Sequence, residues 1–278
     1  DVEPLDLIAT SRDGAVPAVP DDAAVVLLAG PTAALSAHET DALVSYVNRG
    51  GGLIVAQDPG GENLELLRRM GIGIPSGVAS DTRVVFPFWD RPIPIVREHV
   101  LTESLRSSAM VPVLSHVAPI NVSKSLPKGF KVSPILTTSR KGWIERGGAL
   151  NEGAPIYDEG IDGQGPVTLG VTLEVRPGTD WVSSGSSSAR IVVFGDSDFM
   201  GNGLFTDGPG NATLALESVH WAAGSDARVA SVGARRHKAR RLTISSEQLV
   251  TVRWLSLVFL PTLIGLVGLG VRLSRRGR

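Results

Sequence analysis

The chain contains no cysteine in its 278 residues, and this absence excludes several kinds of site. Disulfide bonds, thiolate metal sites and a cysteine nucleophile are all ruled out. A chain without thiols suits an oxidising compartment, where stray thiols are a liability, although the absence does not fix the compartment.

The sequence also lacks the spacings of common catalytic and nucleotide-binding sites. Its five histidines form no His-x-x-His or His-Glu-x-x-His pair, which argues against zinc. No Gly-x-x-x-x-Gly-Lys-Ser/Thr motif occurs, so the chain is not itself an ATPase. The formal net charge of −1 provides no bulk attraction to nucleic acid. We therefore expect no metal, no cofactor and no nucleic-acid partner.

The composition is that of a globular protein, with 42% hydrophobic and 20% charged residues. Its length allows one large domain or two small ones with a sizeable core. The first 70 residues alternate apolar runs with helical patterns, and connections this short predict a parallel sheet. Ser36 and Glu39 have the spacing of a capping box, and the glycines at 50–52 end that helix. The predicted strands are 4–9, 23–29 and 53–56, the last two buried, and the predicted helices are 37–49 and 62–70.

The middle of the chain, residues 72–160, is dense in proline and small polar residues. We expect an insertion of mostly antiparallel character there, packed beside the sheet. Extended pieces are predicted at 83–88, 110–114 and 131–138. The aromatic residues of this insertion, Phe86, Phe88 and Trp89, are expected in its core, with a recognition surface as the alternative.

The later part of the chain returns to regular elements. Strands are predicted at 167–175 and 190–195, with a surface loop or hairpin tip at 183–188 between them. Asn211 is expected to cap a helix that continues to Ala223, and Gly224 to end it. The apolar contacts of this helix are assigned to Leu214, Leu216, Val219 and Trp221.

The strand at 190–195 is followed by a cluster of small polar residues. Its apolar run, Ile191 to Phe194, lacks alternation, as expected of a strand covered on both faces. Ligands of open α/β sheets gather beyond the carboxyl ends of such strands. The predicted ligand-binding residues are Asp58, Asp196, Ser197, Asp198 and Asn202.

Three chemistries compete for this cluster. The three aspartates could converge on Mg²⁺ or Ca²⁺, but aspartate is also common at such turns for capping alone. Residues 195–197 match the Gly-Asp-Ser start of an esterase motif, which lies near the first strand in those enzymes and late in this chain. The downstream histidines, His220 and His237, lack the expected Asp-x-x-His spacing. We favour capping of backbone N–H groups by Asp196 or Ser197, and expect no catalytic residue.

The C-terminal region changes character after residue 224. Leu255 to Val271 is a run of 17 uncharged residues, close to the minimum for a membrane-spanning helix. Trp254 and the arginines after residue 271 suit interface anchors, and Pro261 is tolerated in lipid. A buried core helix is the alternative. The basic cluster that precedes it, Arg235, Arg236, Lys238, Arg240 and Arg241, is a solvated linker, a contact with anionic lipid headgroups, or a contact with acidic loops of a partner.

Several segments occur in a characteristic order: VVLLAGP followed by LSAHE, RGGGLIVAQDP, RIVVFGDSDFMGNGLF, GNATLALESVHWAAG, a basic stretch and one apolar C-terminal segment. In this order the chain resembles the auxiliary, substrate-binding-like subunits of ABC-type transport systems related to the gliding-motility protein GldG. The similarity spans roughly residues 20–275 and rests on the set of motifs, since no single one would suffice.

The resemblance implies a flavodoxin-like or class I glutamine amidotransferase-like α/β domain beside a separately encoded permease and ATPase. It places the domain in the periplasm and the tail on the cytoplasmic side of the inner membrane. Members usually have another membrane helix and domain upstream, and the start at Asp1 fits a chain without that part. Because cysteine is absent, the usual glutaminase chemistry is excluded.

Together these inferences predict a non-catalytic, membrane-anchored auxiliary subunit that binds a partner or an unknown substrate and couples it to the permease. Contacts with partner or lipid are assigned to Trp254, Pro261, Gly265, Gly268 and the arginines of the basic cluster. A hydrolase or glycan-processing enzyme and a structural envelope scaffold are the alternatives. The expected divisions are an α/β domain over 1–228 with its insertion at about 72–160, a linker over 229–253, a spanning helix over 254–272 and a tail over 273–278.

Overall fold

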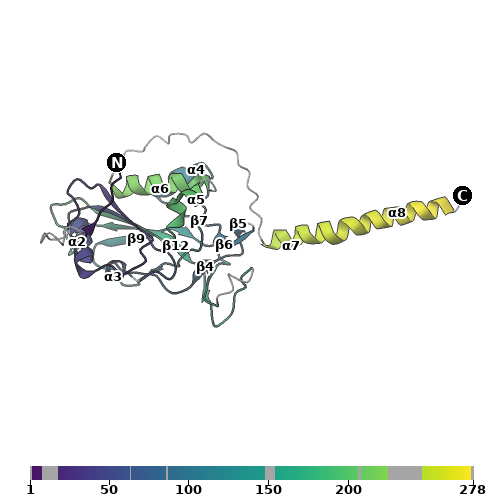
Figure 1. The fold of residues 1–278 in the computed structure, drawn as a ribbon, viewed down its shortest axis with the longest axis horizontal. Helices are drawn as coiled ribbons and strands as arrows, with labels where there is room; N and C mark the ends of the chain where they lie inside the picture. The colour runs from purple at the N-terminus through teal and green to yellow at the C-terminus, as the bar shows by residue number, and fades with distance from the viewer. Residues whose placement is uncertain are drawn as a thin grey trace.

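The computed structural model describes residues 2–7, 18–62, 64–85, 87–147, 154–205, 208–224 and 246–276. Its centre is a six-stranded sheet in the order β1-β2-β13-β12-β9-β7. Figure 1 labels β12, β9 and β7 of this sheet. The strands of this sheet are β1 (Val25–Ala29), β2 (Gly52–Ala56), β7 (Ile95–Val96), β9 (Phe130–Thr137), β12 (Thr168–Val175) and β13 (Ala189–Phe194).

The prediction of a parallel sheet is correct for one half of the sheet only. β1 pairs with β2, and β2 with β13, in parallel register. β12 pairs with both β13 and β9 in antiparallel register, and β7 with β9 likewise, so the sheet is mixed. The cause is visible in the connections, because β12 returns to β13 through the predicted loop at 183–188 rather than through a helix.

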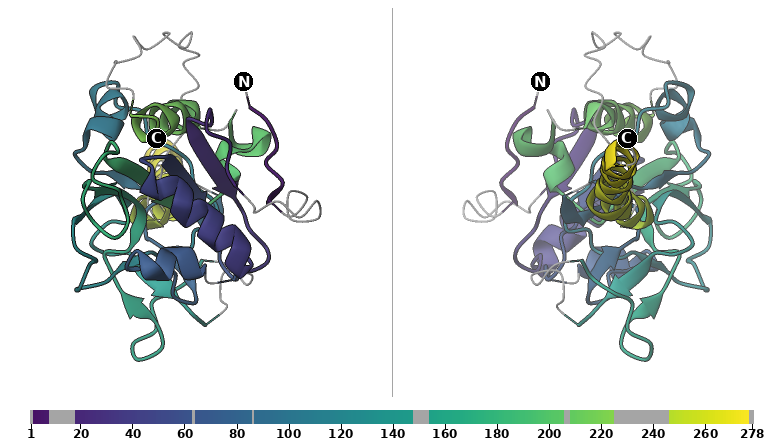
Figure 2. Two further views of the ribbon diagram at one scale, coloured as in Figure 1. Left: turned by 90° about the vertical axis from the view of Figure 1, so that its left-hand side faces the viewer. Right: turned by 90° about the vertical axis from the view of Figure 1, so that its right-hand side faces the viewer.

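Helices cover both faces of the sheet, which makes the domain a three-layer α/β structure (Figures 1 and 2). α2 (Ala37–Asn48) and α3 (Glu65–Arg69) pack on one face, where Leu53 and Val55 point. α4 (Glu103–Ser107) and α6 (Pro209–Ala222) cover the other, where Ile54 and Phe194 point. Because β2 and β13 are buried on both sides, their apolar runs show no alternation.

The sequence signals at α2 are confirmed in atomic detail. The Ser36 hydroxyl accepts a hydrogen bond from the Glu39 N–H at 3.2 Å, and the Glu39 carboxylate accepts one from the Ser36 N–H at 2.8 Å. Gly50 follows the helix with φ +90°, a conformation that favours glycine.

Other local predictions are corrected by tertiary context. β1, expected to be a buried strand, is an edge strand, and its Leu27 side chain is 48% exposed. Residues 4–6 form no strand, and the helix expected over 62–70 is only the five-residue α3. At α6, Pro209 occupies the first turn and Gly208 is the N-cap, so Asn211 lies inside the helix.

The apolar residues of α6 divide between core and solvent. Leu214 and Trp221 are buried as expected, whereas Leu216 and Val219 are 60% and 41% exposed. The helix ends as predicted, with Gly224 at φ +73°.

The region expected to form an antiparallel insertion is only partly separate from the main sheet. Its small ladders are antiparallel, but the predicted extended piece at 131–138 belongs to β9 of the main sheet, and β7, which was not predicted, pairs with it there. Residues 110–114, expected to be extended, have no regular structure. The small strands are β3 (Ile72–Gly73), β4 (Val78–Ser80), β5 (Val84–Val85), β6 (Phe88–Pro92), β8 (Asn121–Val122), β10 (Trp143–Glu145) and β11 (Gly163–Gln164).

The aromatic residues of the insertion are less buried than expected. Phe88 is 42% exposed, and the Arg91 guanidinium lies 4.0 Å from its ring centroid. Trp89 is half-buried, and Phe86 lies outside the described residues. The expectation of core residues is therefore wrong for Phe88.

The C-terminal residues form one long helix, composed of α7 (Ser246–Trp254), the π-helical turn η4 (Leu255–Phe259) and α8 (Leu260–Arg276) (Figure 1). The π turn precedes Pro261, which has no N–H to donate to the preceding turn. The Thr262 hydroxyl donates to the Val258 carbonyl oxygen at 2.6 Å and satisfies one of the acceptors in this turn.

This helix is not part of the protein core. Its 20-residue stretch Val250–Leu269 is long and apolar enough to cross a membrane, and none of it is buried. The alternative of a buried core helix is thereby wrong. The remaining short elements are η1 (Val100–Thr102), η3 (Asp198–Met200) and α5 (Asn202–Phe205).

Candidate functional site

The polar residues that follow β2 and β13 meet at one edge of the sheet. Because these two strands are parallel neighbours, Asp58 and Ser197 emerge side by side from their carboxyl ends. The Ser197 N–H donates to Asp58 Oδ1 at 2.6 Å, and the Ser197 hydroxyl donates to Asp58 Oδ2 at 2.6 Å. Both oxygens of the Asp58 carboxylate are therefore engaged by a single residue.

Asp196, one residue before Ser197, is wholly buried. Its Oδ1 accepts from the Asp198 N–H at 2.8 Å, and its Oδ2 accepts from the Ser115 N–H at 2.9 Å. The first contact fixes the turn that leads into η3, and the second anchors a segment 81 residues away in the chain. The favoured prediction, capping of backbone N–H groups, describes Asp196 correctly.

The burial of Asp196 has an electrostatic consequence. Desolvation of the carboxylate raises its pKa to about 7, against the opposing effect of the two backbone N–H donors. The negative charges of Asp198 and Asp58 add a smaller increase in the same direction. A carboxyl group at this position holds its proton up to near-neutral pH.

Gly30, directly after β1, packs closely against one side of the Asp58–Ser197 pair. Gly30 adopts φ +55°, and a Cβ atom there would lie 2.9 Å from Ser197 Oγ and 3.0 Å from Asp58 Oδ2. A side chain at this position would have to displace the Asp58–Ser197 pair. Glycine thus lets three loops meet with no space between them.

The remaining predicted residues do not join this cluster by side-chain contacts. Asp198 is exposed and contributes its backbone N–H, and Asn202 is exposed at the start of α5. Among the described residues, no group of three histidine or carboxylate side chains is placed to hold a metal ion. Convergence of Asp58, Asp196 and Asp198 on a hard cation, one of the alternatives, is therefore not supported.

The hydrolase alternative requires a nucleophile with a base beside it. Ser197 instead donates its hydroxyl proton to the carboxylate of Asp58, and no histidine within the described chain hydrogen-bonds to it. Asp58 and Ser197 bond to each other, and the Asp196 carboxylate accepts from two backbone N–H groups. This arrangement builds a rigid turn at the sheet edge.

Three residues of this edge escaped the sequence interpretation. Ser115 binds Asp196 through its N–H, and its hydroxyl donates to Asp90 Oδ2 at 3.0 Å. Gln57 is almost fully buried and its Oε1 has no hydrogen-bond partner. Its position directly before Asp58 was a usable signal, whereas Ser115 lies in a segment without a recognisable pattern.

The structure describes only some of the residues that were assigned to membrane or partner contact. Trp254 is 63% exposed at the end of α7, and Pro261 follows the π turn. Cβ atoms built on Gly265 and Gly268 meet nothing within 4 Å, so both glycines leave open space along α8. The arginines of the basic cluster, Arg235, Arg236, Arg240 and Arg241, lie outside the described residues.

A family profile described as an ABC-type uncharacterized transport system matches residues 1–218. The chain belongs to this family. The resemblance to auxiliary subunits of ABC-type transport systems is thus confirmed, and a role as a transporter accessory follows at this general level. Comparison with curated proteins finds no match.

Two solved structures are similar to the ABC-transport family domain described here. The mmIFT52 N-terminal domain aligns with a TM-score of 0.52 at 15% identity, over 80% of this chain and 83% of that one. This likeness concerns the fold alone. A ThuA-like protein from Bacteroides uniformis aligns with a TM-score of 0.39 at 14% identity, over 77% of this chain and 79% of that one, which is too low to support a conclusion.

Proposed function

We propose that the protein is a non-catalytic auxiliary subunit of an ABC-type transporter, anchored in the inner membrane by its C-terminal helix. The observation that carries this proposal is the unburied, 20-residue apolar stretch Val250–Leu269 behind a domain of the ABC-type transport family. An exposed apolar helix of this length lowers the solubility of a protein in water and is stable in a lipid bilayer.

In this proposal the α/β domain lies in the periplasm and the short arginine-rich tail in the cytoplasm. The GldG-like motif order supports that orientation, and the parallel β1–α2–β2 unit supports kinship with flavodoxin-like and amidotransferase-like folds. The domain division runs near residue 228, with the linker to 253 and the spanning helix over 254–272. The engagement of Asp58, Asp196 and Ser197 with each other and with backbone N–H groups argues against catalysis at the strand ends.

The partners in this proposal are a permease and an ATPase, and α8 contacts the permease through Gly265 and Gly268. Small residues let two helices approach closely in lipid, and the open space at both glycines leaves room for a partner. Trp254 then lies at the membrane interface, where its ring is stable.

Purification of the full-length protein in mild detergent tests the proposal. A permease and an ATPase should co-purify in a stable ratio, and replacement of residues 254–272 by an unrelated spanning helix should abolish this. The double substitution Gly265→Leu and Gly268→Leu should reduce co-purification by about tenfold, as expected for loss of close helix packing.

The matched control is Val267→Leu, which adds bulk about 200° around the helix from Gly265. It should leave the co-purified ratio unchanged. The coupling role would be wrong if the protein purified alone, or if Val267→Leu lost the partners as much as the double glycine substitution did.

A further inference from the structure

An open hollow of about 530 Å³ lies beside α3, away from the strand-end cluster. Its volume falls in the range of small-molecule sites in proteins. The lining residues come from the end of α3, from β3, and from β8 with the loop that follows it, and they include Arg68, Arg69, Val122, Lys124 and Pro127.

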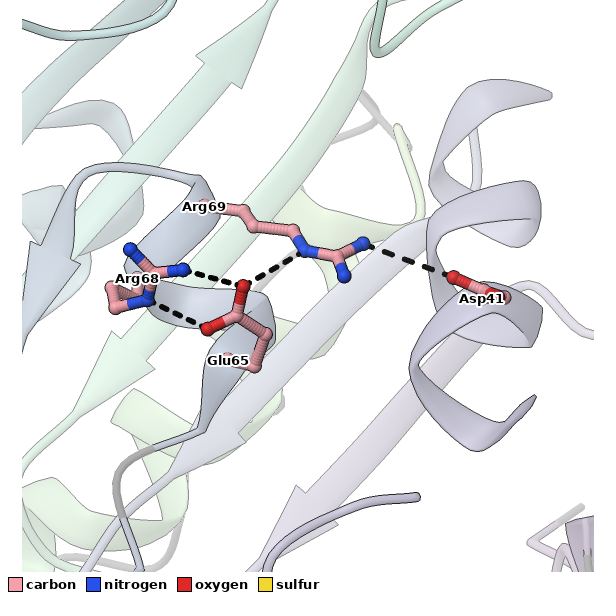
Figure 3. Close-up of polar contacts among 4 residues, drawn as sticks. All are labelled: Asp41, Glu65, Arg68 and Arg69. Carbon is pink, nitrogen blue, oxygen red and sulfur yellow. Dashed lines mark hydrogen bonds and ion pairs between the residues drawn. The ribbon is translucent and has the colours of Figure 1, made fainter. Parts of the chain in front are cut away.

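The charges that line the hollow are all positive. Arg68, Arg69 and Lys124 line it, and no acidic residue does. Two carboxylates stand next to it and contact the arginines, Glu65 on α3 and Asp41 on α2 (Figure 3). Three cations against two carboxylates leave the site with one uncompensated positive charge.

Glu65 holds the two arginine side chains in place. It accepts hydrogen bonds from Arg68 Nε at 2.6 Å, Arg68 Nη2 at 2.7 Å and Arg69 Nε at 3.1 Å (Figure 3). The Arg68 and Arg69 hydrogen bonds lower the pKa of Glu65 to about 2, so this anchor stays ionised. These are exposed ion pairs, which orient the two guanidinium groups but constrain them only weakly.

Each guanidinium keeps N–H groups to spare. A guanidinium has five donors, and Arg68 uses two of them on Glu65. Arg69 uses one on Glu65, and its Nη1 stands 3.8 Å from Asp41 Oδ1, too far for a direct hydrogen bond. Within the described parts of the chain, the other donors of both residues have no acceptor.

Lys124 supplies the uncompensated charge. It forms no ion pair with any described residue, and its loop is held by contacts of its neighbours. The Ser123 N–H donates to the Gly71 carbonyl oxygen at 2.8 Å, and the Ser125 N–H donates to the Ser123 hydroxyl at 3.2 Å. The ammonium group is therefore carried by a fixed turn that faces the end of α3.

We propose that this hollow binds a small organic ligand through one anionic oxyanion group, a carboxylate or a phosphodiester. Lys124 and the spare N–H groups of Arg68 and Arg69 bind the anionic group, because charge-assisted hydrogen bonds are the strong ones. Val122 and Pro127, which are half-buried, contact the apolar part of the ligand. One uncompensated charge matches a monoanion.

This inference goes beyond the proposed function and does not depend on it, since binding is a property of the purified chain alone. Titration of the full-length chain in a non-ionic detergent, followed by saturation-transfer NMR or calorimetry, measures it. The probes are butyrate, the isosteric but neutral butyramide, and diethyl phosphate. Butyrate or diethyl phosphate should bind in the millimolar range and butyramide at least about tenfold more weakly, as expected for loss of a charge-assisted contact.

Three exposed substitutions test the residue assignments. Lys124→Ala should weaken binding of the anionic probe by about tenfold, and Glu65→Gln should tighten it because two arginines lose their competing carboxylate. Lys128→Ala is the matched control, a nearby exposed lysine that does not line the hollow, and should change binding less than about twofold.

The proposal has clear ways to fail. Equal binding of butyrate and butyramide would overturn it, as would equal losses in Lys124→Ala and Lys128→Ala. Weaker binding in Glu65→Gln would show that the arginines act through Glu65 and not on the ligand. If diethyl phosphate alone binds, the ligand is a phosphodiester, and vesicles with and without phosphatidylglycerol then separate a lipid headgroup from a free solute.

Discussion

Two polar regions of this domain differ in how far their hydrogen-bonding groups are paired within the chain. In the strand-end cluster, Asp58 and Asp196 use all four carboxylate oxygens on N–H and O–H groups of the chain. In the basic hollow, Arg68, Arg69 and Lys124 retain donors that no described residue accepts. The strand-end cluster lies where ligands of α/β sheets usually bind, whereas the basic hollow has the unpaired donors that a ligand needs.

The difference teaches where binding capacity resides in such a fold. Parallel strands place polar residues at one edge of the sheet, whether or not these residues bind a ligand. The backbone N–H groups of the turns there compete with any ligand for the polar side chains. Asp58 and Asp196 are consumed in that competition by Ser197 and Asp198, which follow β13, and by the Ser115 N–H. At α3 the donors outnumber the nearby acceptors, so a surplus remains for a ligand.

The strongest test of this comparison is the pH dependence of stability that the raised pKa of Asp196 predicts. Its pKa is about 7 in the folded chain and about 4 in an unfolded one, so between these pH values the folded state holds a proton that the unfolded state has lost. The stability contributed by the neutral form is complete below pH 4 and is lost as pH rises through 7. Relative to Asp196→Asn, the free energy of unfolding of the native chain should therefore fall by up to about 4 kcal/mol between pH 4 and 8.

Urea denaturation of both chains across this pH range measures the effect. Other carboxyl groups titrate in both proteins, so only the difference between the two profiles counts. Parallel profiles would show that Asp196 has the same pKa in the folded and the unfolded chain, and the account of its burial would be wrong.

A smaller loss is expected from the neighbouring carboxylate. Asp58→Ala leaves the Ser197 N–H and hydroxyl without an acceptor in a half-buried place, at a cost of about 1–3 kcal/mol in the free energy of unfolding. Asp58→Asn keeps one acceptor oxygen and should lose about half as much. Urea midpoints give both values, and an unchanged midpoint in Asp58→Ala would mean that the cluster is open enough for water to replace the carboxylate.

The sequence was sufficient for several features that a local sequence pattern predicts. The capping box at Ser36 and Glu39 and the stop at Gly224 depend on local chemistry, and the unbroken apolar runs of β2 and β13 predicted their burial on both faces. The sequence failed where distant packing decides. Leu27 has the same apolar character as Ile54, yet its strand lies at the sheet edge because no further strand pairs with it in the described chain.

The candidate site divides along the same line. The proximity of Asp58 to Ser197 could be predicted from two neighbouring parallel strands, and it is confirmed. The role of Ser115 could not, since it is a backbone contact between segments 81 residues apart. The basic hollow was missed for the same reason, because Arg69 and Lys124 are brought together only by the short β3–β8 ladder.

The smallest expected effect is at the hollow itself. Lys124 is exposed and has no carboxylate partner among the described residues, so Lys124→Ala should change the free energy of unfolding by less than about 0.5 kcal/mol. Urea denaturation beside Asp58→Ala provides the direct contrast, a large loss of stability at the strand ends and almost none at α3. A loss above about 1 kcal/mol in Lys124→Ala would mean that this lysine supports the fold. The hollow would then be a structural feature, and its positive charge would no longer argue for a ligand.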